Sequence, residues 1–185
     1  MRRAELSRRL ALTVVAAVAC GVLATSGSAR APVAARTILS GTLVLPAGSV
    51  QKVCRGARAG TKAKPLVRLS CGATGVFTGK PARAGANYYW TWTLPISNTG
   101  RTKALGPEVG RIGLNFGAGK IIYLSTQGAE TPRGATAGRT TGKWVVSGGT
   151  GIHAGASGKG TYVFDTKIVS SRFTVMRVAL KGSIG

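Results

Sequence analysis

The sequence predicts an all-β protein built as one antiparallel barrel or sandwich, and three observations support this. Glycine accounts for 28 of the 185 residues, about twice its average share of roughly 7%. Short runs rich in Thr, Val and Ile stand between the glycines, which is typical of β-strands. Beyond residue 30, no stretch keeps a 3.6-residue apolar period without an interrupting Gly or Pro, which argues against long helices.

The expected strands follow from local pattern. The run TILSGTLVL at 37–45 ends at the turn residues of PAG, and it predicts a first strand. The run NYYWTWTL at 87–94 is the clearest strand, because Tyr88, Trp90 and Trp92 fall on one face and threonines on the other. That alternation indicates that one face is buried.

Two more runs predict a hairpin. Residues 111–116 place Ile112, Leu114 and Phe116 on one face, and the turn Gly-Ala-Gly leads into the run at 120–126. The Gly/Thr/Arg-rich segment 127–141 is expected to be a loop. The other expected strands are short and flanked by glycines, and they bring the total to eight or nine, without crossover helices, at 66–70, 75–78, 143–147, 160–167 and 172–180.

Residues 1–29 have the features of an export signal. Four arginines precede the uncharged run LALTVVAAVACGVLA, which grades into small residues. The strongly apolar part is shorter than the roughly 20 residues of a spanning helix, so we expect cleavage after Ala29 or Ala35 and no transmembrane segment in the mature form. The single barrel domain is expected at 36–185. The protein is expected to be secreted or to lie in the extracytoplasmic envelope, by either the general or the twin-arginine route, with lipidation at Cys20 as an alternative.

Removal of the leader leaves two cysteines, Cys54 and Cys71, in an oxidising compartment. We expect a disulfide between them. Their spacing does not match a CxxC redox or zinc pattern, and closing such a loop is worth about 3 kcal/mol in the chain-entropy model. Two reduced, buried thiols are the alternative.

The charge balance excludes several classes of site. Lys and Arg number 26 against 4 Asp and Glu, and His153 is the one histidine. So few acids do not suit a multi-carboxylate metal cage, and one histidine does not suit a multi-histidine zinc site. We therefore expect no metal and no cofactor.

The most specific motif runs from residue 142 to residue 162. A strand leads into Gly-Gly-Thr-Gly, and further glycines precede the next strand; the motif residues are Gly148, Gly149, Thr150, Gly151, Gly155, Gly158 and Gly160. Consecutive glycines permit positive φ and a sharp bend, so Val at Gly149 or Gly151 is expected to destabilise the fold. The Gly-Lys-[Ser/Thr] ending of a phosphate loop is missing.

This segment resembles the glycine signature of the allene oxide cyclase barrel superfamily, which includes plant dirigent proteins and small secreted bacterial relatives. The resemblance implies a closed, eight-stranded antiparallel β-barrel. It also implies a cavity inside the barrel in which a reactive small molecule is steered or protonated, although the residues that do so lie outside the matching motif. His153 stands where the family usually has Phe or Tyr, and we expect it to have a packing role.

Three sets of residues are candidate sites. Asp165 and His153 are weak catalytic candidates; Asp165 would be a general acid if it faced inward, but pairing with Lys or Arg at the surface is the stronger expectation. The face Tyr88, Trp90 and Trp92 is either core or the wall of an apolar ligand cavity. The basic stretch 52–68 contains no acid and is a candidate polyanion site, with a generally basic surface as the alternative. Its cations are Lys52, Arg55, Arg58, Lys62, Lys64 and Arg68.

Three function classes stay open at this point. Non-catalytic binding of an apolar small ligand or an anionic envelope component leads, because acid–base groups are scarce. A cyclase-like or dirigent-like enzyme and a structural envelope protein are the alternatives. Nucleic acid is not an expected partner, given export and the lack of aromatic residues in the basic stretch. The sequence does not define an oligomeric state.

Overall fold

The computed structural model of the protein describes residues 36–46, 55–95, 107–134, 137–169 and 172–185. The predicted leader and Lys52 and Cys54 lie outside these residues. Nine strands run through the described part: β1 (Thr37–Val44), β2 (Arg55–Gly60), β3 (Pro65–Lys80), β4 (Ala84–Pro95), β5 (Pro107–Asn115), β6 (Ile121–Pro132), β7 (Ala137–Gly149), β8 (Gly158–Val169) and β9 (Arg172–Ile184). A single 3-10 turn, η2 (Gly151–His153), interrupts the strands of this part. Within the described ranges, no helix has the length and apolar character needed to cross a membrane.

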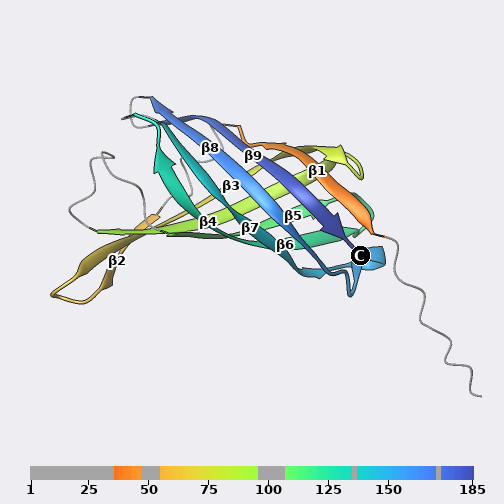
Figure 1. The fold of residues 1–185 in the computed structure, drawn as a ribbon, viewed down its shortest axis with the longest axis horizontal. Coiled ribbons are helices and arrows are strands. Elements are labelled where there is room, and N and C mark those ends of the chain that lie inside the picture. Colours follow the sequence, from red (N-terminus) through yellow and green to blue (C-terminus); the bar gives the residue numbers. More distant parts are fainter. Residues whose placement is uncertain (1–35, 47–54, 96–106, 135–136, 170–171) are drawn as a thin grey trace, which may run out of the picture. The chain divides into compact units, whose positions relative to one another are not determined.

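All nine strands belong to one antiparallel sheet that closes on itself (Figure 1). The strand order is β1-β9-β8-β7-β6-β5-β4-β3-β2, and β1 also pairs with β3. Val44 lies opposite Val76 in this closing pair, and Ser40 lies opposite Lys80. The closure leaves eight strands in the barrel and β2 as an extra strand on β3. The predicted eight-stranded antiparallel barrel is confirmed.

Several strands are longer than local pattern predicts. The runs 66–70 and 75–78 are parts of one 16-residue strand, β3, and the predicted loop 127–141 is wrong. Strand β6 continues through it to Pro132 and β7 begins at Ala137, with Glu130 opposite Thr140. The glycines and Pro132 of this segment resemble a loop in the sequence. Strands β6 and β7 nevertheless pair with each other through this segment, and β8 pairs with β7 on its other side. The pairing in the sheet outweighs the weak local strand propensity.

The basic stretch is a hairpin. Strands β2 and β3 pair antiparallel from Arg55 opposite Ser70 to Gly60 opposite Pro65, and the backbone of Thr61 and Lys64 closes the turn with reciprocal hydrogen bonds of 3.2 and 3.1 Å. Figure 1 shows this hairpin projecting beyond the other strands. The segment is therefore a two-stranded arm.

The barrel interior has an apolar end and a polar end. At the end that holds η2, the side chains of Leu39, Ile122 and Leu114 are fully buried. Toward the other end, where β5 and β7 begin and β6 and β8 finish, the buried side chains include polar ones: Glu108, Thr126, Glu130, Thr140 and Thr166. The interior of the barrel is therefore not uniformly apolar.

The glycine motif makes the bend between β7 and β8. Gly151 has φ of +60°, as expected for such a bend. Gly149 is required for a different reason than predicted: a Cβ there would lie 2.2 Å from the carbonyl oxygen of His153. Thr150 fastens the bend to the β5–β6 turn, because its Oγ1 accepts a 3.1 Å hydrogen bond from the Ile121 amide and donates to the Gly119 carbonyl.

Replacing Gly149 or Gly151 with Val is expected to destabilise the protein by about 2 kcal/mol or more, through a backbone clash at Gly149 and left-handed strain at Gly151. Urea unfolding of each variant measures this loss. Gly85→Val is the matched control, because Gly85 lies exposed in β4 and a Cβ there would lie 3.9 Å from its nearest neighbour atom. Midpoints equal to that of the control for both variants would contradict the account of the bend.

Candidate functional site in the barrel interior and on the basic surface

The most unusual group in the interior is the carboxyl of Glu108. It occupies the second position of β5 and is 0% exposed. The hydroxyls of Tyr88 and Tyr162 both donate hydrogen bonds to its Oε1, and the Tyr162 bond is 3.1 Å long. The two tyrosines come from β4 and β8. Strands β4, β5 and β8 thus meet at one carboxyl group.

Glycines make room for the two tyrosine rings. A Cβ at Gly110 would lie 2.7 Å from Cε2 of Tyr88, and one at Gly128 would lie 2.5 Å from the Tyr162 hydroxyl. A Cβ at Gly142 would lie 2.6 Å from Cε1 of Tyr162. Each ring therefore lies across the bare backbone of neighbouring strands, a close approach that only glycine permits. These glycines therefore leave the space that the two tyrosine side chains occupy beside Glu108.

Burial controls the protonation of the cluster. Desolvation raises the pKa of Glu108 to about 7, and the hydrogen bonds from Tyr88 and Tyr162 lower it only in part. Burial, followed by the nearby Glu108 charge, raises the pKa of both tyrosines. The tyrosines therefore stay protonated donors, while Glu108 exchanges its proton near neutral pH. A carboxyl tuned in this way has the property required of a general acid or base.

Four buried polar atoms in the described part of the chain have no hydrogen-bond partner of ordinary geometry within the protein: Trp90 Nε1, Trp92 Nε1, Glu108 Oε2 and Thr140 Oγ1, although the Thr140 hydroxyl is close enough to the Glu108 carboxyl to lower its pKa. Buried polar groups are nearly always paired with protein or with water. Trp92 and Glu108 are directly opposite in the β4–β5 ladder, so a donor and an acceptor of this group lie on neighbouring strands. These atoms are the ones that a buried water would satisfy.

The aromatic face that was a candidate ligand wall points inward, as predicted. Tyr88, Trp90 and Trp92 are 0 to 1% exposed. Their rings contact one another and Phe164, with centroids 5.0 to 6.2 Å apart. Packing of this kind is typical of a filled core, and it supports the core interpretation of these rings.

The two catalytic candidates do not come together in the interior. Asp165 lies on β8 between the inward-facing Phe164 and Thr166, and its carboxylate accepts two hydrogen bonds from Arg139 at 2.6 and 2.9 Å. This is the surface ion pair that the sequence favoured. His153 lies in η2, half-buried, with its ring 5.6 Å from that of Phe116. Its surroundings fit the packing role.

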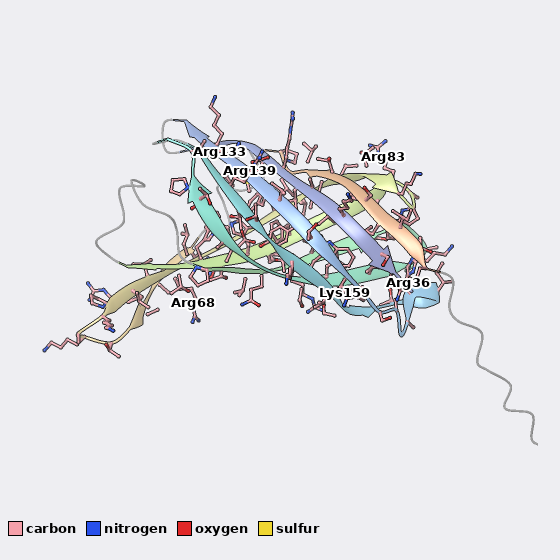
Figure 2. All side chains as sticks on the ribbon, viewed as in Figure 1. Arg36, Arg68, Arg83, Arg133, Arg139 and Lys159 are labelled. Carbon is pink, nitrogen blue, oxygen red and sulfur yellow. The ribbon has the colours of Figure 1, made fainter. Side chains whose placement is uncertain are left out.

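The candidate polyanion residues that the structure describes are all exposed on the hairpin: Arg55, Arg58, Lys62, Lys64 and Arg68. Arg55 and Arg68 belong to the outer face that carries Ser70, whereas Arg58 lies opposite Val67 on the other face. Figure 2 shows Arg68 on this arm, and Arg83, Arg133 and Lys159 around other parts of the barrel. The cations are thus a property of the whole outer surface, with a concentration on the hairpin.

Sequence reasoning missed Glu108 and Tyr162. The signal for Glu108 was present: counting back by twos from Leu114 and Ile112 leads through Gly110 to Glu108 on the same inward face. The signal for Tyr162 was its alternation with Phe164. The predicted strand at 111–116 began too late to include Glu108, because a proline and an acid are uncommon at buried strand positions.

Glu108→Gln is expected to flatten the pH dependence of stability. Between the ordinary carboxyl pKa of 4.5 and about 7, folded Glu108 keeps a proton that the unfolded chain has released. The free energy of unfolding therefore falls as pH rises through this window, by about 3 kcal/mol in total. Urea unfolding at pH 5 and pH 8 measures the difference. Asp165→Asn, which alters a surface carboxylate, should keep the slope of the unmodified protein; the same slope in Glu108→Gln would show that Glu108 is not the titrating group.

Comparisons of the chain with protein-family models, with curated proteins and with solved structures found no match. The resemblance to the allene oxide cyclase barrel superfamily therefore rests on the glycine segment at 142–162. It stays a prediction.

Proposed function

We propose that the protein is a secreted, non-catalytic binding protein whose cationic outer surface binds an anionic polymer of the cell envelope. The observation that carries this proposal is the location of the acids. Glu108 and Glu130 are buried in the barrel, at 0% and 7% exposure, and Asp165 is paired with Arg139. The described outer surface therefore presents almost only positive charge, and a field of one sign attracts polyanions.

The hairpin offers the densest part of this surface. Its cations are held on a hydrogen-bonded two-stranded arm, so less side-chain and backbone freedom is lost on binding than in a loose loop. The leader predicted at 1–29 supports the extracytoplasmic location of the proposed partner. The expected disulfide would fix the base of the arm: Cys71 is buried on β3 next to Ser70, and Ser70 lies opposite Arg55, the residue that follows Cys54 in the sequence.

Protein purified from an oxidising compartment is expected to contain a bond between Cys54 and Cys71. Mass spectrometry of a digest prepared without reductant should find the two cysteines in one linked peptide pair. Reduction is expected to lower the stability by about 3 kcal/mol, because it releases a closed loop in the unfolded chain. Two free thiols in the exported protein would contradict the disulfide.

A second candidate function is chemistry on a reactive small molecule inside the barrel, in the manner of cyclase-like or dirigent-like enzymes. The specific observation in its favour is Glu108, a buried carboxyl with a pKa near 7, an unpaired Oε2 and two tyrosine donors. The packed rings beside it argue for a small guest at most. Binding of an apolar ligand at Tyr88, Trp90 and Trp92 meets the same restriction. Polymer binding at the surface needs no interior space, and it is the better supported function.

The test is binding of the mature protein to polygalacturonate, a defined anionic polysaccharide, across a salt series. Affinity is expected to fall by about tenfold or more between low and moderate salt, because exposed charges are screened within about 10 Å at 0.1 M. The variant with Gln at Arg55, Arg58, Lys62 and Lys64 should lose most of the binding and keep its stability, since surface charges contribute little to the fold.

The matched control replaces four exposed cations of the same types elsewhere on the barrel, Arg83, Arg133, Lys159 and Lys181. This control should retain binding within about twofold of the unmodified protein. An equal loss in both variants would show that the whole surface acts and that the hairpin is not a site. Absence of binding by the unmodified protein at low salt, to polygalacturonate and to polyphosphate alike, would overturn the proposed function.

A further inference from the structure

A depression of about 480 Å³ lies on the outer face of strands β2 to β5, at the base of the hairpin. Its lining combines two arginines, two aliphatic hydroxyl side chains, one tyrosine and one valine: Arg55, Arg111, Ser70, Thr91, Tyr89 and Val109. None of its lining residues is acidic. Arg111 was not among the residues singled out from the sequence, and the depression extends beyond the basic stretch onto the barrel wall.

The strand registers place these residues in two adjoining rows. Arg55, Ser70, Thr91 and Val109 are successive cross-strand partners in one row. Tyr89 and Arg111 are direct partners in the next row. Arg55 and Arg111 are separated by three strand spacings, roughly 14 Å, across the strands and by two residues, roughly 7 Å, along them, so their backbones lie about 16 Å apart. The two arginines thus lie on opposite sides of the small polar side chains of Ser70 and Thr91.

One lining residue of the depression is an exposed aromatic ring. Tyr89 is 54% exposed and Val109 is 52% exposed, whereas the hydroxyls of Ser70 and Thr91 are engaged with each other at 3.1 Å. The Arg111 guanidinium lies 4.6 Å from the centroid of the Tyr123 ring of β6, so it lies on the β6 side of the depression and its edge is left to donate hydrogen bonds. A flat apolar surface and two anion-binding groups are therefore displayed together.

We infer that this depression is the specific recognition site for an acidic polysaccharide, with a sugar ring stacked on Tyr89 and acidic groups bound by Arg55 and Arg111. The inference rests on the proposed function and names the place and the substrate class for it. An arginine fork binds carboxylate and phosphate alike. The span of about 16 Å favours an oligosaccharide with several acidic groups over a single sugar acid.

Two other polyanions fit the depression less well. Polyphosphate carries the charge but has no apolar face to cover Tyr89 and Val109. Single-stranded nucleic acid requires several exposed rings for successive bases, whereas the lining of this depression holds one exposed ring, Tyr89, and the neighbouring Trp90 is 1% exposed. A polymer of sugar rings with regularly spaced acidic groups matches both the charge and the apolar surface.

The experiment measures calorimetric affinity for tetragalacturonate, galacturonic acid, polyphosphate and a single-stranded DNA oligonucleotide. Tyr89→Ala should weaken tetragalacturonate binding by roughly three- to tenfold, the range for loss of an aromatic contact, and leave polyphosphate binding unchanged. Tyr89→Phe should keep the affinity. Arg111→Gln should weaken both polymers, while Arg111→Lys should weaken tetragalacturonate more than polyphosphate, because it keeps the charge and loses the fork.

The controls are Ile38→Ala, an exposed apolar residue on β1, and Arg83→Gln, an exposed cation elsewhere; both should bind as the unmodified protein does. If the hairpin variant loses binding but Tyr89→Ala and Arg111→Gln keep it, the depression is not the site and the proposed function stands. Equal losses of both polymers in Tyr89→Ala would overturn the stacking. Tighter, Tyr89-dependent binding of the DNA would overturn the choice of polysaccharide, and so would equal affinity for galacturonic acid and its tetramer.

Discussion

The pairing of β1 with β3 is the constraint on which the rest of the structure depends. One edge of β3 pairs with β1. The other edge of β3 pairs with β4, from Leu66 opposite Pro95 to Phe77 opposite Ala84. Closure removes the free edges of the eight strands. It also gives every strand one face toward a narrow interior and one toward solvent. The position of each charged and aromatic residue follows from that division.

An eight-stranded barrel is just wide enough for side chains to fill it, and this chain fills it by pairing large rings with glycine. The Trp144 ring lies across Gly160 and Gly182, where an added Cβ would come within 2.4 Å of it. Tyr162 lies in the same way across Gly128 and Gly142. The high glycine content therefore has a structural cause beyond turns. It allows three tryptophans and two tyrosines to occupy one interior, all of them at most 1% exposed.

Closure also separates the charges. The acids Glu108 and Glu130 are inside the barrel, where desolvation favours the neutral form of the Glu108 carboxyl. The cations are outside, where water solvates them and where mutual repulsion is the cost of the one-signed surface. The buried carboxyl groups of Glu108 and Glu130 therefore do not neutralise any of the positive charge on the outer surface. The interior chemistry and the exterior charge are two consequences of one arrangement.

The sequence by itself determined the class of fold, the inward face of Tyr88, Trp90 and Trp92, the β5–β6 hairpin and the Asp165 surface position, because period-two alternation and glycine turns are local signals. It did not determine the length of β3 or the strand character of 127–141, where the glycines and Pro132 weaken local strand propensity. Only the tertiary structure brought Glu108 to Tyr162, and Arg55 to Arg111 around Tyr89. Both placements bring together residues of separate strands whose register belongs to the closed sheet, and no local pattern encodes that register.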